Sequence, residues 1–404
     1  MNRCKTQSLW TKDYILLLTA NFFLFFAESL FLPVLPVYVK QNGADDVQVG
    51  VVAAVFFITS ILMRFFTAKA AARFGKRTVL FAGMFVFTLA MVGYYLFSGL
   101  APVIVLRLIQ GVGFGASSTL YGSTVAGIVP DEKMGEGMGY LGLGVSVAYV
   151  LGPCLGAAVI PLPHFKWIFL VAAFLALVSI LLTRFIAAED FDRVPADEGP
   201  SGSGIADMVE PRVLYESSFI FLLGLFMNSC DTYVVLYAKQ LKISNIFLYF
   251  IATTIAEVGT RLFAGKLYDK KGMNASVIPG ATAGLASCIV ASFARDLPTI
   301  CVFALLFGAA IGMIFPGAEA NAMKKVPAGR RIAANATFYN MLDIGSGLGP
   351  LAFGAVSQTR GYAGSFLLSS VVFALMLALP LFKYLVGKYR SNGASAPARE
   401  NSAR

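Results

Sequence analysis

Apolar residues run along this chain in long blocks separated by short polar connectors. About a dozen of these blocks reach roughly 20 residues, the length that crosses the hydrocarbon core of a bilayer as a helix. They predict helices over these ranges: 14–40, 47–67, 77–97, 101–125, 135–160, 166–187, 213–239, 246–265, 275–294, 298–323, 331–357 and 363–387. The pattern therefore predicts an all-α membrane protein with twelve transmembrane helices.

The composition excludes a long water-soluble domain. Of the 404 residues, 57% are hydrophobic and 13% are charged, and the mean hydropathy is +0.74. A soluble domain has about 25% charged residues. The first apolar block, 14–40, is too long for a cleaved signal peptide. Five cysteines are scattered without a paired spacing and His164 is the one histidine, so the sequence indicates no metal site and no other cofactor.

The formal net charge of +10 is explained by where the positive residues lie. Connectors on the side of the N-terminus hold 23 Lys and Arg residues, the opposite connectors hold six, and three lie within or at the ends of helices. Cytoplasmic loops of membrane proteins are enriched in Lys and Arg. We therefore expect a multi-pass protein of the cell (inner) membrane with both termini in the cytoplasm, and no binding to nucleic acid.

The chain contains two similar halves. At a constant offset of 197 residues, "RFFTAKAAARFG" at 64–75 lies over "RLFAGKLYDKKG" at 261–272, and "LGP" at 151–153 lies over "LGP" at 348–350. Such a parallel duplication is typical of transporters whose substrate site lies between the halves at the bilayer midplane. We predict two pseudo-symmetric six-helix bundles, at 1–187 and 213–387, with a cytoplasmic linker at 188–212 and a disordered cytoplasmic tail at 388–404.

Four motifs give the chain a family resemblance. They are "LPVLPVY" at 32–38, "AKAAARFGKR" at 68–77, "RLIQGVGFGA" at 107–116 and "AYVLGPCLGA" at 148–157. With them, residues 10–390 resemble the major facilitator superfamily, and the first and last motifs resemble those of its twelve-helix drug:proton antiporters. The resemblance implies the major facilitator fold and export by alternating access. It also implies that Pro33 and Pro36 bend the outer end of the first helix.

The resemblance also assigns gating positions. In the family, the connector after the second helix carries a glycine and an aspartate that help to latch the halves on the cytoplasmic side. Here Ala68 and Ala72 replace them, whereas the second-half copy keeps Gly265 and Asp269, so we expect the latch at Asp269 to be the stronger one. Glycine and proline in the fifth and eleventh helices are expected to let these helices bend at the moving interface. The gating candidates are Arg73, Gly75, Gly152, Pro153, Gly265, Asp269, Gly272, Gly349 and Pro350.

Ionisable residues inside the predicted helices are candidates for the transport site, because an unpaired charge at the bilayer centre costs at least about 2.5 kcal/mol. Glu28 lies about 21 Å from the cytoplasmic end of its helix and Arg107 about 9 Å from the outer end of its own, so their depths match in a core about 30 Å thick. We expect these two side chains to pair. The proton or substrate candidates are Glu28, Arg107, Asp231, Glu257, Glu319 and Asp343.

Two of these acids have an alternative interpretation. Glu257 and Arg261 are four residues apart on one helix and can neutralise each other. Glu319 lies five residues before Lys324, near the cytoplasmic mouth, where a structural or gating role and a substrate contact are equally open.

The sequence predicts a transporter rather than an enzyme. A buried carboxylate can hold a proton and release it when a cationic substrate arrives, so we expect a monomeric, proton-coupled efflux antiporter of small amphipathic, neutral or cationic compounds. No Walker A sequence is present, so ATP is not expected to drive it. Three alternatives stay open: an exporter of an endogenous metabolite such as a siderophore-like compound, a proton-coupled metabolite uptake symporter, and a non-transporting sensor or lipid-handling scaffold.

Overall fold

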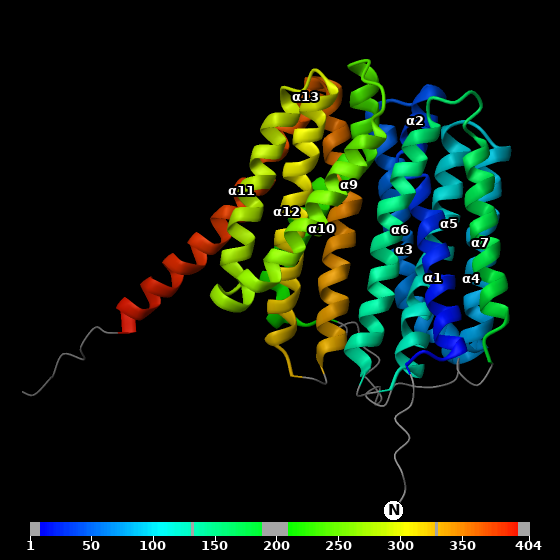
Figure 1. The fold of residues 1–404 in the computed structure, drawn as a ribbon, viewed down its shortest axis with the longest axis horizontal. Helices are drawn as coiled ribbons and strands as arrows, with labels where there is room; N and C mark the ends of the chain where they lie inside the picture. Colours follow the sequence, from blue (N-terminus) through cyan, green and yellow to red (C-terminus); the bar gives the residue numbers. More distant parts are fainter. Residues whose placement is uncertain (1–8, 131–132, 188–208, 328–329, 395–404) are drawn as a thin grey trace, which may run out of the picture.

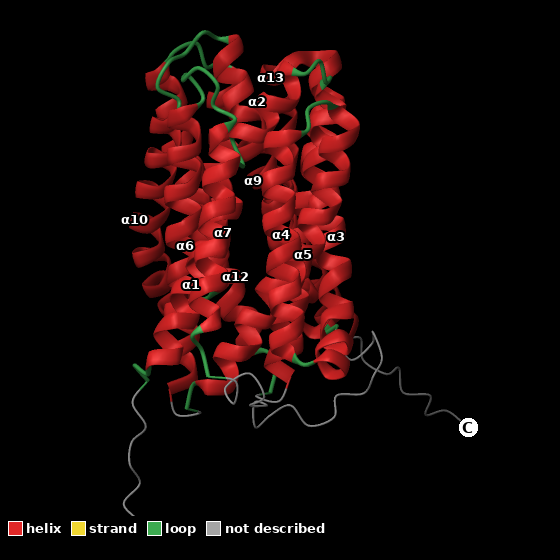
Figure 2. Ribbon diagram, turned by 90° about the vertical axis from the view of Figure 1, so that its right-hand side faces the viewer, coloured by secondary structure: helices red, strands yellow, loops and turns green. Residues whose placement is uncertain are grey.

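A computed structural model describes residues 9–130, 133–187, 209–327 and 330–394 of the chain. Most of the predicted linker, residues 188–208, and the last part of the predicted tail, residues 395–404, lie outside the described residues. Within the described ranges every regular element is a helix, as Figure 2 shows.

The helices follow the apolar blocks closely. In chain order they are α1 (Lys12–Leu30), α2 (Val34–Gln41), α3 (Asp46–Phe74), α4 (Lys76–Leu96), α5 (Leu100–Ile128), α6 (Met134–Val159), α7 (Trp167–Arg184), η3 (Pro211–Val213), α9 (Leu214–Gln240), α10 (Phe247–Lys271), α11 (Met273–Ser292), α12 (Leu297–Lys324) and α13 (Arg331–Ala394).

The described helices account for twelve membrane crossings. Eleven segments are long and apolar enough to span a membrane, and the last of them, Ala334–Phe382, is 49 residues long. That segment breaks at Gly361, whose φ of 68° is not helical, so α13 contains two membrane helices. Likewise, α1 and α2 form a single segment, Lys12–Gln41. The predicted all-α membrane fold with twelve transmembrane helices is confirmed.

The first transmembrane segment is broken where its prolines stand, as predicted. Helix α1 ends at Leu30, and α2 begins at Val34 directly after Pro33. A proline has no N–H to continue the helical ladder. The carbonyls at the break are satisfied locally, because Ser29 O accepts from Leu32 N at 3.2 Å and Phe31 O accepts from Leu35 N at 2.8 Å.

Three predicted helix ends are wrong. Helices α3 and α10 continue past the predicted ends at 67 and 265, and each stops at a glycine with positive φ, Gly75 (84°) or Gly272 (77°). The basic stretches after these positions were predicted to be connectors, but they form helical turns. Lys, Arg and Ala favour helix even outside an apolar block. Helix α13 likewise runs to Ala394, so residues 388–394 of the predicted disordered tail are helical.

Two bundles stand side by side, with α1 to α7 in one and α9 to α13 in the other (Figure 1). Helices α3 and α13 pack along one side of the seam between them, and α6 and α10 along the other. We call the side on which α1 begins the near side, and the side on which α2 ends the far side.

The two bundles repeat each other in atomic contacts. A Cβ placed on Gly115 of α5 would come within 2.5 Å of the Ser60 carbonyl oxygen on α3, and one on Gly312 of α12 would collide with the Glu257 carbonyl on α10. Gly115 and Gly312 are 197 positions apart in the sequence, and so are Ser60 and Glu257. The internal repeat is therefore a repeat of helix packing, in which glycine brings two backbones together.

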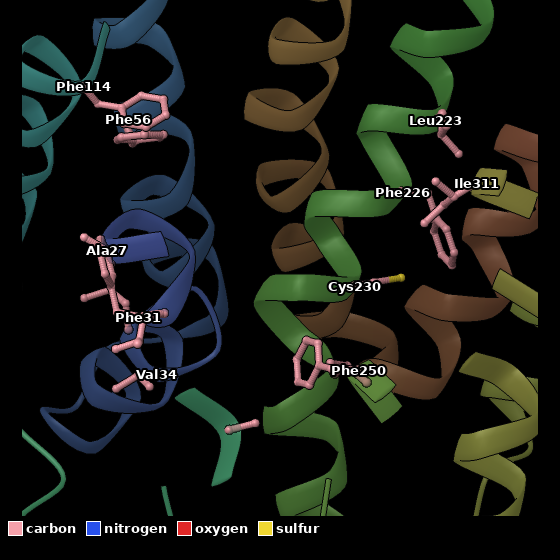
Figure 3. Close-up of a cluster of buried hydrophobic side chains, with 14 of the residues drawn as sticks. Ala27, Phe31, Val34, Phe56, Phe114, Leu223, Phe226, Cys230, Phe250 and Ile311 are labelled. Carbon is pink, nitrogen blue, oxygen red and sulfur yellow. The ribbon is translucent and has the colours of Figure 1, made fainter. Parts of the chain in front are cut away.

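Each bundle has its own aromatic core (Figure 3). In the first, the rings of Phe56 and Phe114 lie 5.3 Å apart. In the second, Phe226 on α9 meets Phe307 on α12 edge-on at 5.0 Å. Because each bundle is filled by its own apolar side chains, the polar residues at the seam are not needed to pack either core.

Candidate transport site between the two bundles

The seam is closed on the far side by contacts around Asp46, the first residue of α3. Its carboxylate forms an ion pair with Lys40 and accepts hydrogen bonds from Ser357 Oγ and Tyr362 Oη of α13, each at 2.8 Å. Tyr233 of α9 donates to the Asp46 carbonyl at 2.6 Å. We call these five residues the far-side seal. Three of its hydrogen bonds join one bundle to the other.

Beneath the seal, Arg107 of α5 is held without an acidic partner. Its Nε donates to the Val52 carbonyl at 3.1 Å and its Nη1 to Gln110 Oε1 at 2.9 Å. Its guanidinium also lies 4.7 Å from the ring centre of Phe56 and 5.5 Å from that of Phe31. A buried guanidinium is stabilised by such ring faces.

Arg107 also lines a small cavity that reaches the second bundle. The cavity is about 10 Å³, with Asn228 and Thr232 of α9 on its other wall. A volume of this size has room for one water molecule. Arg107 is therefore buried at the seam, next to residues of the second bundle.

The expected ion pair between Glu28 and Arg107 is absent from this conformation, although the charge of Arg107 acts on Glu28. No ion pair of 4 Å or less joins these two residues, both of which are described. Glu28 on α1 is 1% exposed, and its Oε2 has no hydrogen-bond partner. Matching depths along two helices did not fix which way each side chain points, and Arg107 turns toward a carbonyl, an amide and two rings instead.

A second carboxylate from the opposite bundle also lacks a cation. Asp231 on α9 has no hydrogen bond or ion pair with any described residue, and its charge and that of Glu28 are close enough to act on each other. The Tyr149 hydroxyl of α6 is within reach of the Glu28 carboxylate. The seam therefore holds two acids, one from each bundle, that form no ion pair with a described residue, although the charge of Arg107 acts on Glu28 without contact.

Asp343 is the candidate that the structure pairs across the seam. Its carboxylate on α13 forms an ion pair with Arg64 Nη1 on α3. The pattern of apolar blocks alone assigns Arg64 no role. A usable signal was present, because Arg64 stands over Arg261 in the repeat and both are basic residues at membrane depth.

The remaining two candidates are partnered within the second bundle. Glu257 and Arg261 form the ion pair expected from their spacing, at 3.2 Å. Glu319 of α12 accepts a hydrogen bond from Tyr339 of α13 at 3.1 Å, on the near side of the other acids. Among the described residues, Glu28 and Asp231 are therefore the candidate acids that lack both an ion pair and a resolved hydrogen bond.

The gating candidates divide into packed and open positions. A Cβ on Gly152 of α6 would lie 2.9 Å from Leu30 N, and one on Gly349 of α13 would meet the Leu225 carbonyl. Pro153 and Pro350 both lie inside these helices. The Ser346 carbonyl, which Pro350 cannot bond, accepts from Asn228 Nδ2 at 2.6 Å.

No near-side latch forms among the described residues. Asp269 is exposed and makes no hydrogen bond or ion pair with the described residues, and a Cβ on Gly265 would meet nothing within 4 Å. The Arg73 guanidinium lies over the neighbouring Phe74 ring at 5.3 Å. Asp269 therefore has no latch partner among the residues that the structure describes, in a conformation with the far-side seal closed.

Two bundles of membrane helices with buried charges at the seam define a membrane transporter of the alternating-bundle class. A model of the Major Facilitator Superfamily matches residues 17–295 and 275–403, so the chain belongs to this family.

Similar proteins include bacterial proteins named for multidrug resistance. The multi-drug resistance efflux pump PmrA of Streptococcus pneumoniae is 26% identical over 400 residues, which cover 94% of this chain and 98% of PmrA. The multidrug resistance protein MdtG of Citrobacter koseri is 27% identical over 365 residues, covering 86% of this chain and 88% of MdtG.

Solved structures share the fold. A mutant form of the nucleoside transporter NupG superposes with a TM-score of 0.76 at 13% identity, over 91% of this chain and 99% of NupG. A bacterial homologue of the human lysosomal transporter Spinster, in an inward-facing and occupied conformation, gives a TM-score of 0.74 at 14% identity, over 91% and 95% of the two chains.

Proposed function

We propose that this protein is a proton-coupled efflux antiporter for small amphipathic compounds that are neutral or cationic. The observation that carries the proposal is the pair of acids Glu28 and Asp231, which come from opposite bundles and form no ion pair among the described residues.

Two carboxylates at this depth cannot both stay ionised while no proton or cation is bound to either. Each unpaired charge at the bilayer centre costs at least about 2.5 kcal/mol, and like charges in one site raise that cost further. A proton on one acid removes the cost, and so does a cation bound between them. A single site that holds either a proton or cargo gives antiport when the two bundles rock about it.

The surroundings favour cargo with an apolar body. Phe25 stacks edge-on against Phe114 at 5.1 Å and against Tyr149 at 5.9 Å, close to Glu28. Aromatic walls with a few fixed polar groups are typical of sites for small organic molecules. A cationic headgroup would also be attracted to the ring faces.

Several further points support export from a cytoplasmic near side. A relative named as a multi-drug resistance efflux pump matches 94% of the chain, and one named as a multidrug resistance protein matches 86%. The excess of basic residues in connectors on the side of the N-terminus favours a cytoplasmic near side in an inner membrane. Each chain would work as a monomer, because both walls of the site come from one chain.

The test is dye transport in inverted membrane vesicles with an imposed pH gradient. We expect proton-driven accumulation of a cationic dye by the wild type, and at least a tenfold lower rate in Glu28→Gln and Asp231→Asn. Asp296→Asn is the matched control, because Asp296 is an exposed cap of α12 outside the site.

Unaltered proton-coupled transport in both site variants would refute the assignment of the site. Movement of substrate and protons in the same direction would refute antiport and favour the uptake symporter.

A further inference from the structure

The repeat places two arginines at matching positions but gives only one of them an acid on its own helix. Arg64 on α3 corresponds to Arg261 on α10, 197 positions later. Four residues before Arg261 stands Glu257, which forms an ion pair with it at 3.2 Å. Four residues before Arg64 stands Ser60, which cannot neutralise it.

The facing helices show the opposite difference. Arg64 crosses the seam to Asp343 on α13. The residue that corresponds to Asp343 in the first bundle is Ser146 on α6, the helix that packs along α10. The Ser146 hydroxyl donates to Gly142 O of its own helix at 3.1 Å, so Arg261 has no acid there. In the second half, the acid that pairs with the arginine lies on the arginine's own helix. In the first half, it lies on a helix of the opposite bundle.

This exchange makes the two sides of the seam unlike. The α3–α13 side carries an ion pair between bundles and, closer to the far side, the hydrogen bonds of Asp46 to Ser357 and Tyr362. No hydrogen bond or ion pair between the described residues of α6 and α10 crosses the other side. Helix α3 also packs along α13 far more extensively than α6 packs along α10.

We propose that the Arg64–Asp343 ion pair on the α3–α13 side helps to keep the far-side seal closed and releases it when a proton or a cationic group takes Asp343, with Arg64 as the positioning residue that ties Asp343 to the first bundle. Glu257 serves a different purpose, because it neutralises Arg261 within α10 and moves with it. The coupling role rests on the proposed transport function; the assignment of the ion pair as the lock between bundles does not.

The physical basis is a competition for one carboxylate. While Asp343 is ionised and paired, α3 and α13 are held together below the seal. A proton or a cationic group that takes Asp343 leaves Arg64 without its partner, so the bundles lose the one ion pair that joins their described residues. The Glu257–Arg261 pair cannot transmit such a change, since both of its members belong to the same helix.

Hydrogen–deuterium exchange of the full-length protein in nanodiscs tests this without cargo or a gradient. We expect Asp343→Asn and Arg64→Gln each to raise deuterium uptake at least twofold in peptides from 46–52 and 350–358. The double variant should add little to either single change, and the reversal Arg64→Asp with Asp343→Arg should bring uptake back toward the wild type. Glu257→Gln should change uptake only in peptides of α10.

A size-matched pair of variants tests the competition with both native partners in place. Ser60→Glu gives Arg64 the neighbour that Arg261 has, so it should draw the guanidinium away from Asp343 and loosen the same peptides. Ser60→Gln has nearly the same size and no charge, so the difference between the two variants isolates the charge. Because Ser60 is buried, both larger side chains strain the packing of α3 on α5, but Ser60→Gln should loosen these peptides clearly less than Ser60→Glu.

Three results would overturn the proposal: equal loosening by Glu257→Gln, equal effects of the two Ser60 variants, or a charge reversal that leaves uptake as high as in the singles. If the seal responds as expected while vesicles export nothing, the ion-pair lock is supported and the proposed export is refuted.

Discussion

Glycine at 111 brings α5 against α3, and enlarging it should destabilise the first bundle by a predictable amount. In Gly111→Ala the new Cβ would lie 2.6 Å from the carbonyl oxygen of Phe56, and a backbone atom cannot rotate away. Ordinary contacts begin near 3.4 Å, so the two helices must separate by about 0.8 Å. Overpacking of this kind costs about 1–3 kcal/mol.

The same helix supplies the control. A Cβ on Gly122 of α5 would meet nothing within 4 Å. Both alanine variants gain helix propensity of about 1 kcal/mol, so this gain cancels when they are compared. We expect Gly122→Ala to be at least as stable as the wild type and Gly111→Ala to be about 1–3 kcal/mol less stable than Gly122→Ala.

Reversible denaturation of the purified protein in mixed micelles measures the difference. The repeat sharpens the expectation, because a Cβ on Gly308 would come even closer to the Thr253 carbonyl than the one on Gly111 comes to Phe56. Gly308→Ala should therefore cost at least as much, with Gly259→Ala as its open control. Equal stability of Gly111→Ala and Gly122→Ala would refute the inferred glycine-mediated packing of α5 on α3.

Two other changes have clear outcomes. Gly50→Ala places a Cβ 2.5 Å from the Pro350 carbonyl across the far-side seam, so thiol labelling of an added far-side cysteine should rise severalfold, with Gly142→Ala unchanged because that site is open. Outside the membrane, hydrogen bonds from Arg330 (2.8 Å) hold the pKa of Glu210 below its usual 4.5. A lowered pKa in the folded state stabilises the protein above about pH 4.5 and loses this effect as the pH falls through the folded-state pKa. The melting temperature of Glu210→Gln should therefore lie below that of the wild type at pH 7 and approach it near pH 3. A difference in melting temperature that does not change with pH would exclude stabilisation by the ionised Glu210 carboxylate.

The sequence was sufficient for the fold because membrane helices are specified by length and polarity. Block length gave the helices, and the constant offset gave the two bundles. The break at Pro33 followed from a missing N–H. The ends of α3 and α10 were missed because polar turns can be helical, and only the positive φ of Gly75 and Gly272 stops them.

The site was predictable as a set of charges but not as a set of pairs. An ion pair between neighbours on one helix, Glu257 with Arg261, follows from spacing alone. A pair between bundles depends on the rotation of each helix about its axis, which depth does not define. For that reason Arg107 was expected to meet Glu28, and Arg64 was not expected to meet Asp343.

Proton release on cargo binding tests the central claim most directly. The purified protein in weakly buffered detergent is mixed with a cationic dye, and a pH indicator records the protons that leave. If one site holds either a proton or a cation, the wild type releases about one proton for each dye bound, and Glu28→Gln or Asp231→Asn releases markedly less. Dye that binds the wild type without releasing protons at any pH between 5 and 8 would contradict the account.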